Sequence, residues 1–188
     1  MKIIVNNKYV LPVVYTVIVM SEKGKRIAFE WIDSNQKRLA EISDEIWGYA
    51  ELGYVEFKSA MLLADELERH GFEVERGVAG IPTAFVGTWG KGKPVVGVMG
   101  EYDALPGLSQ KAVPHKEPIK EGEPGHGCGH NIHGTSGLGG AIALRYAMEK
   151  AGVKGTVKFL GCPAEEMLSG KVWMVREGVF DGVDAVLS

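Results

Sequence analysis

The sequence predicts an α/β protein in which helices flank a largely parallel β-sheet, and three observations lead to this prediction. Segments whose apolar residues recur at helical spacing alternate along the chain with short apolar segments typical of strands. Two of the strand-like segments, PVVGVMG (94–100) and TVKFLG (156–161), are almost wholly apolar, as is usual for strands covered on both faces. Glycine is frequent, with 26 of 188 residues, and most of these glycines lie after residue 76, where they mark turns between the segments.

The individual elements follow from periodicity and from glycine and proline punctuation. In chain order, we expect helices at 26–52 and 57–70, strands at 72–75, 84–89 and 94–99, a helix at 131–150, a strand at 156–161, a short helix at 171–177 and a strand at 185–187. Gly53, Gly71 and Gly152 are the expected helix stops. Residues 104–127 show little periodicity and hold four of the eight prolines, which predicts a long loop of a kind that is often functional.

Residues 1–19 differ in composition from the rest, so the domain is expected to span residues 20–188. The apolar run at 9–20 is too short to cross a bilayer, which needs roughly 20 residues. Three interpretations of this segment stay open: an extension upstream of a start at Met20, a valine-rich strand, or a secretory signal. The secretory-signal interpretation requires a small-x-small cleavage site after the apolar run, and the sequence shows none there.

The overall composition excludes several classes of function. Apolar residues make up 45% and charged residues 24%, which is typical of a globular domain. The net charge of −3 and the lack of a dense basic tract argue against nucleic acid as a partner, and a membrane partner is not expected either. Two cysteines cannot make a disulfide scaffold, so we expect reduced thiols and a cytoplasmic location.

The densest group of chemically active side chains is GHGCGHNIHG (125–134), in which three histidines surround Cys128. Imidazole and thiolate are ligands that a borderline-soft divalent metal prefers. Cys128 and His130 are two residues apart and reach one site from a turn, while the interleaved glycines let the backbone fold closely around an ion. The alternative is a glycine-rich turn with solvated histidines.

Two acidic groups follow predicted strands, where sites gather in open α/β sheets. Glu165 and Glu166 come after the strand at 156–161, and adjacent residues of an extended segment point to opposite sides. We therefore expect one carboxylate to bind a metal and its neighbour to accept a proton, as metal-assisted hydrolysis requires. Asp103, just beyond the strand at 94–99, is a candidate for holding a ligand histidine in the correct tautomer. The alternative for the glutamate pair is a solvated acidic turn, and Cys162 is expected to be a small buried residue.

Three motifs in this order, GEYDALPGLSQ (100–110), GHGCGHNIHGT (125–135) and GCPAEE (161–166), resemble the M20 family of metal-dependent amidohydrolases and carboxypeptidases. The likeness is to its cysteine-containing branch, and within that to the aminobenzoyl-glutamate group. It covers about residues 27–188, including DEIWGYAELGYVEFKSA (44–60), and leaves out residues 1–19. Asn131 stands where many members of the branch carry aspartate, whereas the aminobenzoyl-glutamate group has asparagine there.

The resemblance implies a role for each matching residue. Cys128, His130 and Glu166 look like metal ligands, with Cys128 in the place of a ligand that bridges two ions. Glu165 looks like the general base and then the general acid, and Asp103 like the supporting carboxylate. His126 and His133 belong to the motif and are assigned no ligand role. The implied cofactor is a divalent metal, zinc or manganese with cobalt as a further candidate, with up to two ions in the complete family site.

The implied reaction is hydrolysis of an amide bond in a small N-acyl or aminobenzoyl amino acid. Family members also have further histidine ligands, a lid and dimerisation domain and a C-terminal segment beyond the position of Ser188. We therefore expect residues 20–188 to be an incomplete catalytic domain, with a homodimer only for the full-length family form. Two alternatives remain: a non-catalytic metal-binding fragment or split subunit that needs a separate C-terminal half, and a metal-free α/β binding module.

Overall fold

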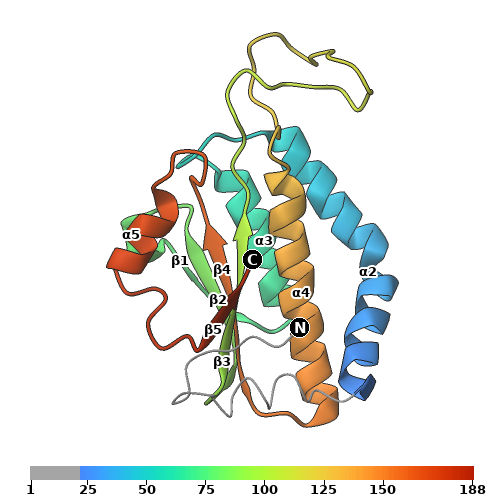
Figure 1. Ribbon diagram of the computed structural model, residues 1–188, viewed down its shortest axis with the longest axis vertical. Helices are drawn as coiled ribbons and strands as arrows, with labels where there is room; N and C mark the ends of the chain where they lie inside the picture. The colour runs from blue at the N-terminus through green and yellow to red at the C-terminus, as the bar shows by residue number, and fades with distance from the viewer. Residues whose placement is uncertain (1–21) are drawn as a thin grey trace, which may run out of the picture.

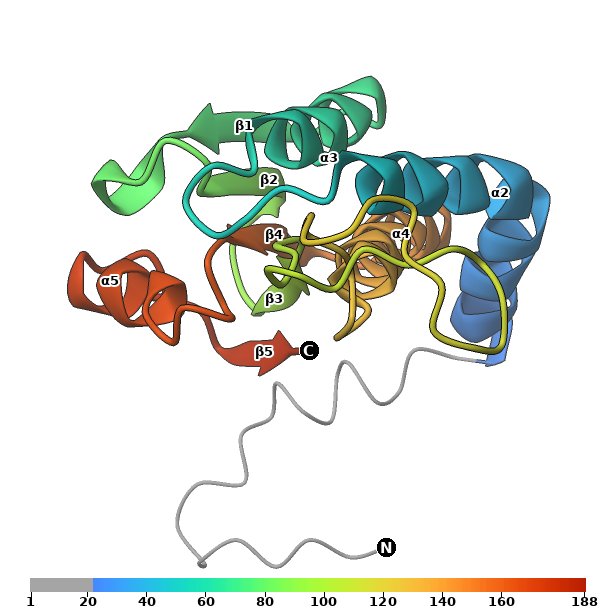
Figure 2. The ribbon, with the colours of Figure 1, turned by 90° about the horizontal axis from the view of Figure 1, so that it is seen from above.

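The computed structural model describes residues 22–188, so the interpretations of residues 1–19 lie outside the described residues. The elements, in chain order, are α2 (Glu22–Tyr49), α3 (Phe57–Arg69), β1 (Glu73–Arg76), the 3₁₀ turn η1 (Val78–Gly80), β2 (Phe85–Lys91), β3 (Val95–Glu101), α4 (His130–Ala151), β4 (Gly155–Cys162), α5 (Gly170–Arg176) and β5 (Ala185–Leu187). Helices α2, α3 and α4 lie on one side of a five-stranded sheet and α5 lies on the other (Figure 1, Figure 2). The predicted class, an α/β sheet flanked by helices, is confirmed.

The sheet itself is mixed, which corrects the expectation of a largely parallel one. Its strand order is β1-β2-β4-β3-β5; β3 runs parallel to β4 and β5, whereas β1 and β2 pair antiparallel. The physical reason lies in the connections. A parallel neighbour needs a crossover of a dozen or more residues, and the segment that joins β1 to β2 is too short for one. The long crossover through α4 places β4 between β2 and β3.

Every predicted helix and strand is present, with ends that differ by a few residues. The largest differences are in α2, which begins at Glu22 and ends at Tyr49 rather than at Gly53. Ala50 follows it with a φ of +44°, a conformation that ends the helix before glycine is reached. Gly71 and Gly152 follow α3 and α4 in the left-handed region, as expected for helix stops. Among residues 22–188 no helix combines the length and the apolar character that crossing a membrane requires.

The core forms on both faces of the sheet because alternate strand residues point to opposite sides. Phe85 and Phe159 pack on the face covered by α3 and α4, with the fully buried Leu138 and Ile142 of α4. Val86 and Leu160, their neighbours in sequence, pack instead with Met174 of α5. β3 and β4 are therefore covered on both faces, as their apolar sequences predict.

Helix α4 lies close to β3 because its first turns carry glycines. A Cβ atom at Gly134 would come 2.6 Å from the carbonyl oxygen of Glu101, and one at Gly137 would come 2.5 Å from that of Met99. The GTSGLGG stretch (134–140) is thus the close-packing surface that the sequence predicts. This approach brings the first residue of α4, His130, to the carboxyl end of the sheet.

The segment between β3 and α4 is the predicted long loop, which has neither helix nor strand and projects beyond the end of the sheet (Figure 1). Its two arms meet where Leu105 and Gly125 exchange backbone hydrogen bonds of 3.0 Å. The returning arm then leads directly into the glycine-rich turn at 125–129.

Candidate metal centre

Three chain segments meet at the carboxyl edge of the sheet. Glu101 ends β3 and lies opposite Cys162, the last residue of β4, in the parallel register. The glutamate pair follows Cys162, and the glycine-rich turn leads into α4 beside them. Gly129 adopts a φ of +77° before the helix begins at His130, a conformation for which glycine is favoured. The edge therefore collects side chains that lie far apart in the sequence.

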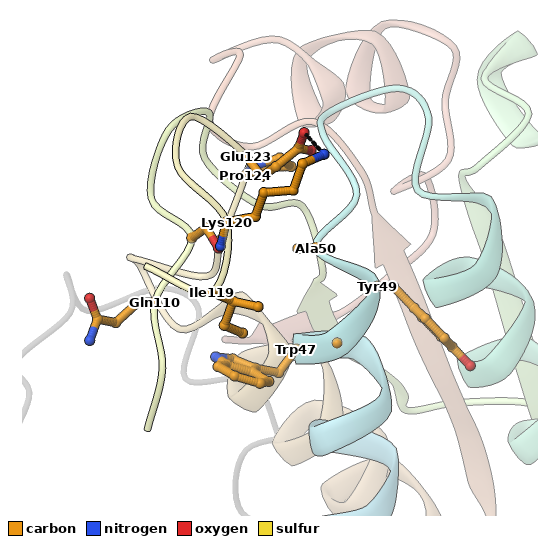
Figure 3. A pocket seen from close by; sticks show the side chains of 11 residues that line it. Trp47, Tyr49, Ala50, Gln110, Ile119, Lys120, Glu123 and Pro124 are labelled. Carbon is orange, nitrogen blue, oxygen red and sulfur yellow. Dashed lines mark hydrogen bonds and ion pairs between the residues drawn. The ribbon is translucent and has the colours of Figure 1, made fainter. Parts of the chain in front are cut away.

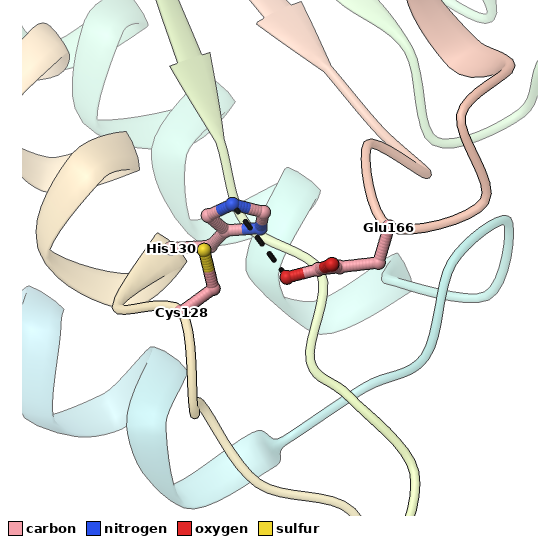
Figure 4. A group of neighbouring side chains, drawn as sticks. All are labelled: Cys128, His130 and Glu166. Carbon is pink, nitrogen blue, oxygen red and sulfur yellow. Dashed lines mark ion pairs between the residues drawn. The ribbon is translucent and has the colours of Figure 1, made fainter.

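Cys128, His130 and Glu166 converge, as the sequence predicts (Figure 4). One potential ligand atom from each lies within 4.8 Å of the other two. Cys128 and His130 come from the turn and the first residue of α4, and Glu166 faces them from the segment after β4 (Figure 4). The imidazole is buried, Glu166 is partly buried and the cysteine is exposed.

Asp103 fixes the orientation of the His130 ring. Its Oδ1 atom lies 2.8 Å from Nδ1 of His130, and its backbone oxygen lies 3.1 Å from the same nitrogen. Both oxygens can only accept, so Nδ1 carries the proton and Nε2 presents its lone pair to Cys128 and Glu166. The second oxygen of Asp103 accepts the backbone N–H of Glu166 at 2.9 Å. One carboxylate thus aligns two of the three converging residues.

The electrostatics of this pair follow from burial and hydrogen bonding. Burial opposes ionisation of Asp103, but the hydrogen bonds from His130 and from the Glu166 amide outweigh it and lower the pKa of Asp103. Burial likewise opposes a charged ring, but Asp103, with further help from Glu101 and Glu166, raises the pKa of His130. For Cys128, burial and then the nearby Glu166 raise the pKa of the thiol. The surroundings are strongly acidic, and such a set of groups favours a cation.

One observation tests whether these residues fit a metal. Oε1 of Glu166 is buried and has no hydrogen-bond partner among the described residues, although it lies 3.9 Å from Nε2 of His130. A buried acceptor without a partner is costly. A cation between Glu166, His130 and Cys128 would satisfy it, and their thiolate, imidazole and carboxylate groups suit a borderline divalent ion. The residues present fit the implied metal.

Glu101 is a site residue that the sequence reasoning missed. With His130 and Glu165 it forms a second group of possible ligands, also within 4.8 Å. Its Oε2 lies 3.3 Å from Nε2 of His130, and its Oε1 lies 2.5 Å from Nζ of Lys171 at the start of α5. The available signal was its position as the last residue of an apolar strand, two residues before Asp103.

The glutamate pair departs from the expected geometry. Glu165 and Glu166 do not point to opposite sides, because Oε2 of Glu165 and Oε1 of Glu166 lie 3.8 and 3.9 Å from the same His130 nitrogen. The expectation assumed an extended segment, whereas the chain turns here and Ala164 has a φ of +55°. Both carboxylates therefore face one centre.

The other two histidines of the motif make separate contacts. Nδ1 of His133 accepts the backbone N–H of Glu101 at 3.0 Å, and its Nε2 lies 3.1 Å from the hydroxyl of Ser188. His126 donates from Nε2 to the backbone oxygen of Ile46 at 3.0 Å. Cys162 is buried, as expected, and burial raises the pKa of its thiol to about 12, so it is poorly suited to bind a metal.

A pocket of about 200 Å³ lies between the end of α2 and the long loop. Trp47 and Ile119 face each other across it, and Lys120 and Glu123 form an ion pair of 2.7 Å at its rim (Figure 3). Neither group of possible ligands lines this pocket. Gly125, which does, is three residues before Cys128.

Comparison with known sequences identifies relatives of this chain. Residues 97–188 match the family described as Peptidase family M20/M25/M40. One subunit of the p-aminobenzoyl-glutamate hydrolase of Escherichia coli K12 is 51% identical over 84% of this chain and 33% of that protein. Thermostable carboxypeptidase 1 of Saccharolobus solfataricus is 37% identical over 79% of this chain and 37% of that protein. The chain thus spans about a third of the length of the curated relatives it matches.

Solved structures agree with the sequence relatives. The Bacillus subtilis YxeP protein, described as a dinuclear metal-binding peptidase of the M20 family, superposes with a TM-score of 0.68 at 27% identity, covering 82% of this chain and 42% of that one. An aminohydrolase homologue from methicillin-resistant Staphylococcus aureus has a TM-score of 0.71 at 29% identity, covering 87% of this chain and 41% of that one. By its sequence relatives and its fold, the chain belongs to peptidase family M20/M25/M40.

Proposed function

We propose that this chain carries the metal-binding and proton-transferring residues of an amidohydrolase that cleaves an N-acyl or aminobenzoyl amino acid. The observation that carries the proposal is the convergence of Cys128, His130 and Glu166 around the unpartnered Glu166 oxygen, with Asp103 aligning the ring behind them. Support for the substrate class is the 51% identity to a p-aminobenzoyl-glutamate hydrolase. Zinc, manganese and cobalt are all compatible with this set of ligands.

Cys128, His130 and Glu166 would hold the cation. A divalent ion in this position supplies Lewis acidity, which lowers the pKa of water to roughly 7 and polarises a carbonyl group. The buried ring of His130 offers Nε2 only because Asp103 keeps the proton on Nδ1. Asp103 therefore serves as the supporting carboxylate.

Glu165 is the residue that moves the proton. Its Oε2 atom lies 3.8 Å from Nε2 of His130, and its side chain is 32% exposed, so water and substrate can reach it. In the proposed reaction Glu165 accepts a proton from the attacking water. It then donates that proton to the amide nitrogen as the bond to the carbonyl carbon breaks, so that an acid and an amine are released.

A Glu165→Gln variant tests this assignment, because the amide cannot accept the proton. We expect hydrolysis of p-aminobenzoyl-glutamate to fall by about 10²-fold or more, the range typical of general acid–base groups, while bound metal stays unchanged. The assay is made in a form of the protein with measurable turnover, and metal is quantified by elemental analysis of the dialysed chain. Near-normal hydrolysis by the variant would disprove the role of Glu165.

A second candidate function is favoured by a specific feature of the site. Both possible ligand groups contain His130, so residues 22–188 do not offer two ions separate sets of three ligands. On this alternative the chain binds metal without catalysis, or acts with a separate C-terminal half. Assaying the purified chain with and without a downstream segment from a full-length relative separates the two, since activity of the chain alone excludes the alternative.

A further inference from the structure

A buried carboxylate outside both groups of possible metal ligands has no part in the chemistry described above. Glu56 precedes α3, its side chain is fully buried, and no arginine, lysine or histidine within residues 22–188 pairs with it. Its two oxygens accept from different partners. Oε2 accepts the hydroxyl of Thr83 at 2.9 Å, and Oε1 accepts the backbone N–H of Ala164 at 2.7 Å. Burial raises the pKa of Glu56, so this position is costly for an ionised group.

Ala164 is the residue that this hydrogen bond holds, and its backbone is strained. Its φ of +55° lies in the left-handed region, which residues with a Cβ atom seldom adopt. Such conformations persist where the surrounding structure enforces them, and they cluster at functional sites. Gly53 packs against Ala164 so closely that a Cβ there would lie 3.1 Å from the Ala164 Cα atom. The hydrogen bond and the close packing together enforce the turn.

The turn sets the direction of both site glutamates. Glu165 and Glu166 follow Ala164 directly, and the Glu166 backbone N–H donates to Asp103 at 2.9 Å. The network also reaches β3, because the buried Tyr102 hydroxyl donates to the Thr83 backbone oxygen at 2.7 Å. Through Thr83 and Tyr102, Glu56 thus links the end of β3 to the glutamate pair.

We propose that Glu56 is a positioning residue whose buried carboxyl group locks Ala164 in the left-handed turn and thereby aims Glu165 and Glu166 at the metal centre. The inference rests on the proposed function for its catalytic meaning, but the positioning itself is a property of the chain. It requires an acceptor opposite the Ala164 amide rather than a negative charge.

Three variants distinguish the need for a hydrogen-bond acceptor at position 56 from the need for a negative charge there. Glu56→Gln keeps an acceptor for the Ala164 amide, and the Thr83 hydroxyl can accept from the new NH₂ group as readily as it donates. Glu56→Leu keeps much of the volume but removes the acceptor. The matched control is Glu66→Leu, which removes another buried carboxylate, one that binds Arg38 and Arg69 and does not contact the turn. If Glu56→Leu does not fold, Glu56→Asp replaces it, because its shorter side chain cannot span from Thr83 to Ala164.

The experiment measures two properties of the 188-residue chain. Hydrogen–deuterium exchange reports on the amides of Ala164 and Glu166, and a cobalt(II) titration followed by visible absorption reports on metal affinity. We expect Glu56→Leu to speed exchange at both amides and to weaken cobalt binding about 10- to 100-fold, the range seen when groups that orient ligands are lost. We expect Glu56→Gln to stay close to the unaltered chain and Glu66→Leu to change stability but neither readout.

A rescue variant tests the role of the strained turn directly. Glycine adopts positive φ without strain, so adding Ala164→Gly to Glu56→Leu is expected to recover part of the lost cobalt affinity. Equal exchange and equal affinity in Glu56→Leu and Glu66→Leu would overturn the proposal. Absence of cobalt binding by the unaltered chain would instead refute the proposed function, and the amide exchange would still decide the role of Glu56.

Discussion

At the scale of single residues, the Asp103–His130 pair links the site to pH. Asp103 fixes the tautomer of the His130 ring, and the charges of both side chains depend on pH. The pKa of Asp103 is lowered from 3.8, so its contribution to stability is present above about pH 4 and is lost as the pH falls. The pKa of His130 is raised from 6.5, so its contribution is present below about pH 6.5 and is lost as the pH rises through the folded-state pKa. The charged pair therefore stabilises the metal-free chain most between these limits.

This window predicts a pH-dependent effect of Asp103→Asn. In the presence of a chelator, we expect the variant to lower the free energy of unfolding by about 1–3 kcal/mol at pH 5, the range for a hydrogen bond to a charged group. At pH 8 we expect a smaller loss, because the histidine is then less charged. Urea denaturation at the two pH values measures this difference, and an equal loss at both would show that the charged pair does not form.

At the scale of secondary-structure elements, the contact of α4 with β3 positions His130, and it depends on Gly137. A methyl group there would lie 2.5 Å from the Met99 carbonyl oxygen, so the strand or the helix would have to move. We expect Gly137→Ala to destabilise the fold by about 1–3 kcal/mol, as is typical of overpacking. Gly140, in the same helix, has nothing within 4 Å of the added atom. Gly140→Ala is therefore expected to stabilise the fold by roughly 0.5–1 kcal/mol through helix propensity.

Chemical denaturation of these two variants provides the test, because the substitution is the same and only the surroundings differ. Similar stability changes for both would mean that the helix does not approach the strand as closely as described.

The elements also show which features sequence patterns can predict. β3, β4 and α4 were predictable because apolar runs and helical spacing reflect burial on one or both sides. The carboxyl ends of parallel strands lie at the same edge of a sheet, so the sequence predicts that the residues following β3 and β4 meet there. The closeness of Cys128, His130 and Glu166 agrees with this prediction. The antiparallel direction of β1 and β2 was not predicted, since strand direction depends on pairing partners far apart in the chain. Glu101, Glu56 and the turn at Ala164 were missed for the same reason, as their contacts are tertiary.

At the scale of the whole molecule, the supply of ligands limits how many metal ions the chain can hold. Cys128, His130 and Glu166 form one group, Glu101, His130 and Glu165 form the other, and His130 belongs to both. In addition, Lys171 contacts Glu101 at 2.5 Å and competes with any cation there. The YxeP protein, described as dinuclear, is more than twice as long as the part that this chain covers.

We therefore expect the 188-residue chain to bind about one divalent ion tightly rather than two, because two ions would have to share a single imidazole. Isothermal titration calorimetry with zinc measures the stoichiometry. Cys128→Ser should weaken binding at least tenfold, since the thiolate is the ligand that zinc prefers in this set. Cys162→Ser is the control, because Cys162 is buried and its sulfur contacts the Leu160 backbone oxygen instead of the centre. Two tight sites in the unaltered chain would show that Glu101 and Glu165 bind an ion independently of His130, and equal losses in the two serine variants would remove Cys128 from the ligand set.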